Sequence, residues 1–410
     1  MTTPPAQRSF EALRHPHYRT YFLVMAAAMM ADSIEHVISY WVVFQQFHSP
    51  ALAGFAVASH WFPFLFLSVA VGGLTDRYDP RRLIQIGVLL FMLVSLGWGL
   101  LFLTGTLQMW NAMLLLVLHG VAGVLWNVSG QVLIHHLVPA ASLPSAVRLN
   151  ATSRYLGLLA GPALGSALML VLGPIVGIFT NVAIYLPALL WMQRLPATPA
   201  AEPIAGRPAL RGLGDILATL RVISGHRTIV AMLLLGGSTS LLIGNAYQAQ
   251  MPGFAQDLGH ARVDFSYSLL LGADAAGALL AGLLLESRRM LVARGSSAFV
   301  LALLWSAALA AFALSHSYLF ALPLLCLAGF VELSFNAMAQ TLVQLNAPPA
   351  QRGRVIGLYA MAALGLRGFS GVSVGLIGAL IGIHNSLLLS ALLLSGILAG
   401  GLAFTVRTPR

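Results

Sequence analysis

The chain has 410 residues, of which 58% are hydrophobic and only 8% are charged. Ordinary soluble domains carry about 25% charged residues, so this composition excludes a soluble fold and indicates a protein of the membrane. The net charge of +10 arises from 22 arginines against 12 carboxylates, and the chain contains no lysine.

Twelve apolar stretches are long enough to cross a bilayer, whose hydrocarbon core of about 30 Å requires about 20 residues of helix. They cover residues 19–46, 50–74, 83–104, 109–135, 144–171, 173–194, 228–253, 263–285, 290–314, 317–345, 355–381 and 384–406. Lipid offers the backbone no hydrogen-bond partner, so the stretches must be helices rather than open strands. We therefore predict an all-α membrane protein with twelve transmembrane helices.

Most arginines fall in alternate loops or at the ends of the stretches that border these loops. They are Arg8, Arg14, Arg19, Arg77, Arg81, Arg82, Arg194, Arg207, Arg211, Arg221, Arg227, Arg288, Arg289, Arg294, Arg352, Arg354, Arg407 and Arg410, with Arg262 as the exception. Arginine-rich loops stay on the cytoplasmic side. We predict a multi-pass protein of the cell inner membrane with both termini in the cytoplasm. The positive charge then reflects topology, and we expect no nucleic-acid partner.

The first apolar stretch carries a polar face. Its members are Asp32, Glu35, His36, Ser39 and Tyr40, which follow the i, i+3, i+4, i+7, i+8 spacing of one side of a helix. A charge at mid-bilayer costs at least about 2.5 to 3.5 kcal/mol, so such residues normally line a hydrated cavity. We predict that Asp32, Glu35 and His36 couple protons and that Tyr40 lines the cavity. A structural bridge from the acids to Arg154 or Arg367 is the alternative.

The loop after the second stretch reads GGLTDRYDPRRL, residues 72–83. It resembles the signature G-x-L-a-D-r-x-G-r-r of the major facilitator superfamily. The residues that fit are Gly72, Leu74, Asp76, Arg77 and Arg81, whereas Asp79 and Pro80 depart from it. Glycine lets two helices approach closely, and a carboxylate is attracted to a helix N-terminus. We predict that Asp76 lies against the start of the eleventh helix near Arg354 and latches a cytoplasmic gate that includes Gly72, Arg77 and Arg81.

The fifth stretch contains GLLAGPALGSAL, residues 157–168, which is similar to a "GP-x-x-GG" signature of exporters in this superfamily. Gly157, Gly161 and Gly165 form one flat stripe for helix packing, and Pro162 removes a hydrogen bond so that the helix can bend. The resemblance favours export over uptake. Another exporter signature, an arginine four residues before a glycine in the fourth stretch, is absent because Leu116 precedes Gly120.

The two halves of the chain are related by a repeat. Gly72, Leu74 and Asp76 recur as Gly282, Leu284 and Glu286, and Gly161 and Gly165 as Gly371 and Gly375, at an offset of 210; Asn127, Gln131 and Pro139 recur as Asn336, Gln340 and Pro348 at 209. Residues 194–212 are rich in Pro, Ala and Gly. We predict six-helix halves at 1–195 and 228–410, a cytoplasmic linker at 196–227, a central cavity between the halves, and Glu286 as a further gate residue.

Other polar residues lie within the apolar stretches and are predicted to line the cavity. They are Trp126, Asn127, Arg154, Asn245, Tyr247, Gln248, Glu332, Asn336 and Arg367. Arg154 and Arg367 can each pair with a carboxylate or bind an anionic substrate. His135 and His136 have no carboxylate or cysteine at ligand spacing, so we predict no resident metal.

The segments 48–73 and 346–359 resemble the enterobactin-exporter and macrolide-efflux branch of the superfamily. The resemblance implies a secondary active transporter that works by alternating access, exporting a siderophore or a small hydrophobic, drug-like compound in exchange for protons. We expect protons, a small-molecule substrate and the bilayer as partners, no cofactor, and a monomer.

Three alternatives remain from the sequence. Asp32 and His36 lie four residues apart, a spacing that can hold a divalent metal and that resembles the first helix of ferroportin-type exporters, so the cargo can also be a metal or metal chelate. An intramembrane enzyme has no support from an HExxH or GxSxG motif. A sensor or scaffold that moves no solute is the third.

Overall fold

The computed structural model describes residues 9–48, 50–196, 213–259, 263–288, 293–371, 374 and 377–406. The long helices are α1 (Pro16–Phe47), α2 (Pro50–Thr75), α3 (Pro80–Thr104), α4 (Met109–Leu137), α5 (Leu143–Arg194), α6 (Leu213–Ile223), α7 (Arg227–Leu242), α10 (Val263–Arg288), α11 (Gly295–Leu314), α12 (Tyr318–Asn346) and α16 (Ile383–Val406). The short ones are α8 (Ala246–Ala249), α9 (Met251–Asp257), α13 (Arg352–Ala360), α14 (Arg367–Ser370), α15 (Ile377–Ile381), the 3-10 turns η1 (Glu11–Arg14), η2 (Ala140–Ser142) and η3 (Pro349–Gln351), and the π-helix η4 (Met361–Gly365). Gly375 and residues 197–212 of the predicted linker lie outside the described residues.

Ten helices in the described ranges are long and apolar enough to cross a membrane. One of them, α5, contains two spans, because Gly173 adopts φ 77° and ψ 165° in its interior and the following Pro174 offers no backbone N–H. The eleventh span is the series from α13 to α15, which η4 interrupts. The predicted all-α fold with twelve transmembrane helices is confirmed. Gly173 is the non-helical residue inside α5, and the bend at Pro162 stays a prediction.

Span seven is not the continuous helix predicted over 228–253. Helix α7 ends at Leu242, and Gly244 takes φ 48° before α8 and α9. A Cβ atom at Gly244 would lie 2.6 Å from the Ser370 hydroxyl oxygen and 2.7 Å from the Ser240 carbonyl oxygen. The left-handed conformation and the close approach to α14 therefore both require glycine.

Span eleven also departs from a regular helix. The π-turn η4 lies where a Cβ atom on Gly365 would come within 2.6 Å of the Leu65 backbone. The Ser240 hydroxyl donates to the Ala363 carbonyl inside this turn at 2.5 Å. Such π-turns are rare and occur frequently at functional sites.

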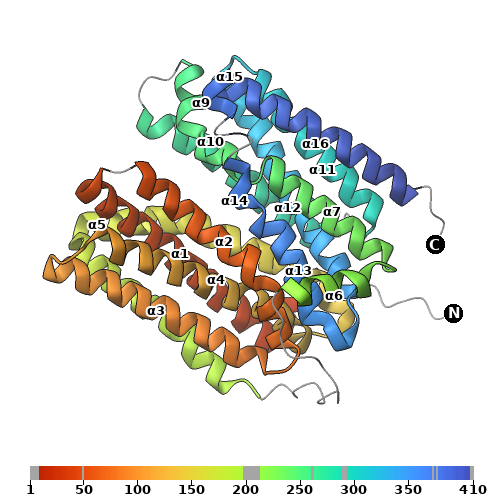
Figure 1. The fold of residues 1–410 in the computed structure, drawn as a ribbon, viewed down its shortest axis with the longest axis horizontal. Coiled ribbons are helices and arrows are strands. Elements are labelled where there is room, and N and C mark those ends of the chain that lie inside the picture. The colour runs from red at the N-terminus through yellow and green to blue at the C-terminus, as the bar shows by residue number, and fades with distance from the viewer. Residues whose placement is uncertain are drawn as a thin grey trace.

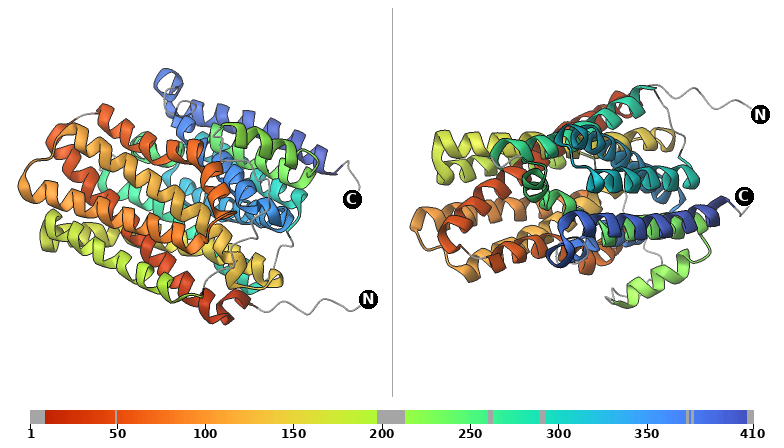
Figure 2. Two further views of the ribbon diagram at one scale, coloured as in Figure 1. Left: turned by 60° about the horizontal axis from the view of Figure 1, so that its bottom comes forward. Right: turned by 90° about the horizontal axis from the view of Figure 1, so that it is seen from above.

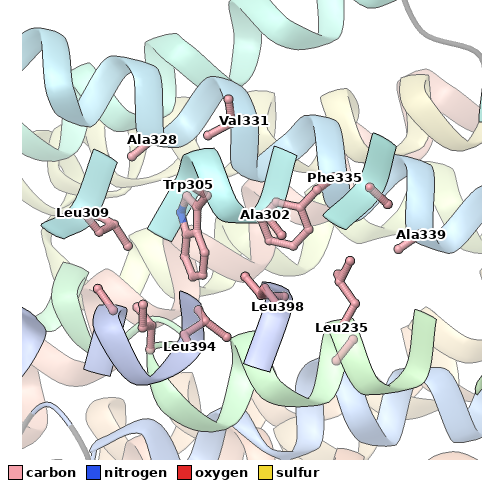
Figure 3. Packing of buried hydrophobic residues seen from close by; sticks show 14 of the residues in the cluster. Leu235, Ala302, Trp305, Leu309, Ala328, Val331, Phe335, Ala339, Leu394 and Leu398 are labelled. Carbon is pink, nitrogen blue, oxygen red and sulfur yellow. The ribbon is translucent and has the colours of Figure 1, made fainter. Parts of the chain in front are cut away.

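The helices form two bundles that converge at the end bearing both chain termini (Figure 1). The N-terminal bundle contains α1 to α5 and the C-terminal bundle contains α7 to α16, and two further directions show them side by side (Figure 2). Each has its own apolar core. In the C-terminal bundle, the Trp305 ring packs among Leu309, Phe335, Leu394 and other residues from α11, α12 and α16 (Figure 3).

The bundles contact each other through two apolar patches. In the first, Phe64 and Val71 of α2 pack with Ile356 of α13 and Leu364 of η4. In the second, Tyr155 of α5 packs against a cluster that includes Ala278 and Ala281 of α10. These pairings, α2 with the eleventh span and α5 with α10, hold the bundles together at the termini-bearing end.

Candidate functional site

A cavity of about 120 Å³ lies between the two bundles. Its polar lining residues are Asn127, Gln131, Asn150, Arg154, Tyr155, Asn245, Gln248, Glu332, Asn336, Gln340, Tyr359 and Arg367. The apolar ones are Ala151, Leu158, Leu333, Ala337, Ala360, Ala363 and Leu364. Amides dominate the polar part, and two arginines face one carboxylate. Such a lining suits a ligand with many hydrogen-bonding groups and a negative charge.

The two arginines of the cavity differ in their surroundings. Arg367 donates to the Asn245 side-chain oxygen at 2.5 Å, lies 3.9 Å from Glu332, and places its guanidinium 5.4 Å from the centre of the Trp61 ring. Arg154 makes no hydrogen bond or ion pair with any residue in the described part of the chain, although it is half-buried. An arginine without a partner inside a membrane protein is available to a ligand anion.

Behind the cavity, a fully buried tyrosine joins two carboxylates. The Tyr247 hydroxyl lies 3.2 and 3.3 Å from the two oxygens of Asp274 and 3.2 Å from Glu332. Gln248 donates to Asp274 at 2.8 Å. Tyr247 has one proton to donate, so it cannot satisfy both carboxylates at once. The predicted assignment of Tyr247 to the cavity lining is wrong, since the ring is 0% exposed and supports Glu332 from behind.

A second ionisable cluster lies inside the N-terminal bundle. The His119 ring on α4 bridges two acids of α1, with Nδ1 2.7 Å from Glu35 and Nε2 2.9 Å from Asp32. Ser95 of α3 donates to the other Glu35 oxygen, and Asn181 donates to Ser95 at 3.2 Å. Asp32 is thus tied to α4, and Glu35 to α4 and α3, all within their own bundle.

This arrangement corrects the expectation that the polar face of α1 opens to the central cavity. Asp32 and Glu35 are 9% and 2% exposed and do not line the cavity, and neither does Tyr40. The bridging partner of the acids is His119 rather than Arg154 or Arg367. Glycines on α5 account for this orientation, because they bring α5 against the opposite side of α1.

Three histidines meet beside these acids. His36, His60 and His119 come from α1, α2 and α4, and their ligand atoms lie within 4.8 Å of one another. The His36 Nδ1 contacts the Asp32 carbonyl oxygen at 2.7 Å. The other ring nitrogen of His36, Nε2, is therefore the one that remains for a ligand. The buried His60 Nδ1 has no hydrogen-bond partner among the described residues. Three imidazoles with an adjacent carboxylate form a donor set that divalent transition metals accept.

Two carboxylates join the bundles at the termini-bearing end. Asp76 accepts hydrogen bonds from the backbone N–H groups of Gly353 at 2.7 Å and Arg354 at 3.1 Å, at the start of α13. We call this contact the first latch. In the second latch, Glu286 of α10 accepts from the Ser145 hydroxyl and from Arg148 at 2.8 Å, in the first turns of α5. The predicted contact of Asp76 with the eleventh span is confirmed.

Glycines make the first latch possible. A Cβ atom on Gly72 would collide with the Gly353 carbonyl, so only two glycines allow α2 and α13 to cross this closely. The linker helix α6 adds an ion pair at 3.3 Å between Asp215 and Arg354. Arg77 is half-buried on the same turn as Asp76. The polar and apolar contacts together close this end of the molecule.

The comparison with known proteins gives the family. The sequence matches the family described as Major Facilitator Superfamily over residues 20–371. The chain belongs to the major facilitator superfamily. It is similar to the enterobactin exporter EntS of Shigella boydii serotype 4 (strain Sb227), with 25% identity over 354 residues, which are 84% of this chain and 81% of the relative.

Two solved structures share the fold of this major facilitator protein. The E. coli fucose:proton symporter FucP, as a point variant, aligns with a TM-score of 0.73 at 14% identity over 95% of this chain and 100% of that one. The human organic anion transporter MFSD10 (TETRAN) aligns with a TM-score of 0.74 at 15% identity over 97% and 100%. The family and the fold make the chain a multi-pass membrane transporter rather than an enzyme.

Several predicted residues of this major facilitator transporter lie where expected. Asn127, Arg154, Asn245, Gln248, Glu332, Asn336 and Arg367 line the cavity. Trp126 does not: its indole donates to the Met25 sulfur at 2.9 Å, and it lines a smaller pocket that shares Asn127 and Arg154 with the cavity. Arg81, predicted as a gate residue, binds Asp79 at 2.5 Å and the Leu195 carbonyl, both in its own bundle.

The α5 glycine stripe packs against α1. A Cβ atom on Gly157 would lie 2.5 Å from Met29 Cβ and one on Gly161 would collide with Ser33, while Gly165 contacts Ile34. The predicted packing role of this motif is confirmed. The stripe directly links the helix that carries Asp32 and Glu35 to the helix that carries Arg154.

The sequence prediction overlooked four members of the buried cluster, namely His60, Ser95, His119 and Asn181. For two of these residues, the sequence contains a feature that could have predicted the buried cluster. His60 and His119 are single imidazoles inside apolar stretches, where a titratable side chain needs a partner. His119 directly precedes Gly120, in the segment that lacks the arginine of the exporter signature. Ser95 and Asn181 have no such signal, because small polar residues are common in membrane helices.

Proposed function

We propose that the protein is a proton-coupled exporter of the inner membrane that carries a polar, anionic small molecule of the siderophore class out of the cytoplasm. The observation that carries this proposal is Arg154, a cavity cation without a partner among the described residues. Arg367 adds a second positive charge. The amide-rich lining supports a hydrogen-bonding cargo over the hydrophobic, drug-like one. The similarity to an enterobactin exporter supports the same class.

The loop arginines support an orientation with both termini in the cytoplasm. Both latches are then cytoplasmic, and the conformation described here is closed on the cytoplasmic side. In alternating access, the two halves rock about the central site and expose it to one side at a time. Breaking the latches would open the cavity to its cargo. We propose a monomer with halves at 1–195 and 228–410 joined by the linker 196–227.

Asp32, Glu35 and His36 are proposed to couple the proton. The acids share His119, so adding protons weakens the bridge between α1 and α4. Because the stripe of Gly157, Gly161 and Gly165 packs α5 closely against α1, a movement of α1 then also moves α5. Since Arg154 lies on α5, protonation inside the N-terminal bundle changes the cavity without direct contact with the cargo.

Transport by purified protein in liposomes tests the cargo. With enterobactin as the probe, wild type is expected to accumulate it against its gradient when a pH gradient is imposed. Arg154→Gln should abolish uphill transport and Arg154→Lys should restore part of it, because a cation remains. Arg19→Gln, at an exposed residue of α1, is the matched control. Transport by Arg154→Gln at the wild-type rate would disprove anion binding at this residue.

The coupling role has a separate test. Asp32→Asn and Glu35→Gln should bind enterobactin but lose proton movement on its addition, since the amides resemble the protonated acids. Removing one charge of a buried bridge typically costs about 3 to 5 kcal/mol, so thermal stability is measured in parallel. Proton movement at the wild-type level in both variants and in the double variant contradicts the coupling role. Unfolded variants rescued by His119→Gln indicate a structural bridge instead.

A second candidate is export of a divalent metal or its chelate. The observation in its favour is the group of His36, His60 and His119. These histidines do not line the central cavity, so the metal would need its own route through the N-terminal bundle. Transport of Zn²⁺, Mn²⁺ or Fe²⁺ into liposomes that is lost in His60→Ala supports this candidate. Absence of metal transport by the wild type excludes this candidate, and wild-type transport in His60→Ala excludes the histidine group as its site.

A further inference from the structure

Two ladders of polar residues run from the cavity toward the latches. On α4 the ladder consists of Asn127, Gln131 and His135, and on α12 it consists of Asn336, Gln340 and Gln344. Within each ladder the residues are four apart, which places them on one face of the helix. Asn127 and Gln131 recur as Asn336 and Gln340 at an offset of 209 residues, and Gln344 stands at the same offset from His135, so the two ladders occupy equivalent positions in the repeat.

The upper rungs and the lower rungs have different surroundings. Asn127, Gln131, Asn336 and Gln340 line the cavity. The remaining residue of each ladder, His135 or Gln344, lies one helical turn closer to the latches. These two lower residues are close enough to interact with each other across the two bundles. The ladders thus continue past the cavity floor into the closed end of the molecule.

The lower rungs are poorly satisfied. Gln344 is 1% exposed, and apart from its interaction with His135 neither atom of its amide has a hydrogen-bond partner among the described residues. Apart from the same interaction, His135 Nε2 is also unpaired, and so are Gln131 Oε1 in the cavity above and Nε of Arg352, the first residue of α13. Buried polar atoms are nearly always paired, and unpaired ones need an explanation. Several unpaired polar atoms lie together at this interface between the bundles. This indicates that the groups are hydrated or bound to a solute in another conformation of the protein.

We infer that the two ladders form the cytoplasmic half of the cargo path, with His135, Gln344 and Arg352 as its vestibule for a polar anion. This inference rests on the proposed orientation and on the proposed anionic cargo. When the latches open, the lower rungs become accessible to water and offer hydrogen bonds to the cargo on its way to Arg154. Arg352 adds positive charge at the mouth, where His136 also lies, with Asp76 and Asp79 as the acids nearby.

Cysteine accessibility tests the path without any cargo. Cys326, the one cysteine of the chain, is replaced by serine, and His135→Cys and Gln344→Cys are introduced singly. Thr75→Cys reports gate opening, because Thr75 is buried at the first latch. Ile134→Cys is the control, since Ile134 is 0% exposed and belongs to the core of the N-terminal bundle. A charged, membrane-impermeant maleimide is added from the cytoplasmic side.

The labelling is compared between the wild-type latches, Asp76→Asn, Glu286→Gln and the double variant. We expect the rates at positions 135 and 344 to rise in parallel with the rate at position 75, by tenfold or more, while position 134 stays unreactive. If position 75 becomes reactive and positions 135 and 344 stay protected, the inferred path is wrong.

Transport provides a second readout. Gln344→Leu and His135→Leu should raise the enterobactin KM on the cytoplasmic face about five- to tenfold each, the effect of one lost hydrogen bond, and leave binding from the outside unchanged. An unchanged cytoplasmic KM in both variants contradicts the vestibule. If wild type moves no enterobactin, the proposed cargo fails, whereas the labelling experiment still decides whether the ladders line the opened side.

Discussion

Replacing Asp76 by asparagine should open the first latch in a large fraction of molecules. The carboxylate is 9% exposed and accepts two backbone hydrogen bonds at the start of α13. Asparagine has one acceptor oxygen, and its NH₂ group would face the other backbone N–H. Hydrogen bonds to charged groups contribute about 1.5 to 3 kcal/mol each, and a helix N-terminus contributes up to about 2 kcal/mol toward an anion.

Because asparagine keeps one of the two hydrogen bonds, we expect a net loss of about 2 to 3 kcal/mol from the closed conformation. This loss changes the ratio of closed to open molecules about 30- to 150-fold, since each 1.4 kcal/mol is a factor of ten. Folding should be preserved, because the bundle cores do not contain Asp76.

Electron–electron distance measurements between spin labels check this prediction. Tyr78→Cys and Ala350→Cys, in the background without Cys326, place labels at two exposed positions on opposite sides of the first latch. The matched control is Asp79→Asn, since Asp79 pairs with Arg81 inside its own bundle. The distance distribution should gain a longer component with Asp76→Asn and should stay unchanged with Asp79→Asn. Identical distributions for wild type and Asp76→Asn would refute the latch.

Three further changes have clear expected outcomes. Gly161→Val should lower the free energy of unfolding by about 1 to 3 kcal/mol, because the added methyls collide with Ser33 of α1. Gly400→Val, whose Cβ meets open space, is the matched control in the same melting experiment. Equal melting temperatures for the two variants would contradict the close packing at Gly161. Trp305→Ala should cost about 3 to 5 kcal/mol, because the ring fills the C-terminal core, and a melting temperature equal to wild type would contradict that packing. Arg81→Gln should leave the distances across the gate unchanged, and an opened gate would show that its contacts extend beyond its own bundle.

The sequence predicted the parts of the molecule that depend on local spacing. The contact of Asp76 with the eleventh span followed from a loop motif and from the attraction of a carboxylate to a helix N-terminus. The repeat offset correctly paired Asp76 with Glu286, and both carboxylates join the bundles. Arg154 lies in the cavity as expected, because a charge in an apolar helix needs a hydrated neighbour.

The direction in which the polar face of α1 points could not be predicted from spacing. The i, i+3, i+4 pattern places Asp32 and Glu35 on one side, but the rotation of α1 depends on which neighbour packs most closely. The α5 glycines bring that helix against Met29 and Ser33, so the acids face α4 instead of the cavity. The break of the seventh span at Gly244 also could not be predicted from the sequence, because glycine is frequent in uninterrupted membrane helices.

The π-turn η4 lies next to a cavity arginine. A π-turn amounts to one extra residue in a helix, and residues on either side of it are offset by about 100° around the helix axis. Arg367 lies two residues after the end of this turn, and its Nε donates to the Ala363 carbonyl inside it at 3.2 Å. If the extra residue migrates along the helix past Arg367, the guanidinium swings away from Glu332 and Asn245 while both bundles stay in place. An arginine of the cavity would then change partners within a single helix, on a length scale much smaller than a movement of one bundle against the other.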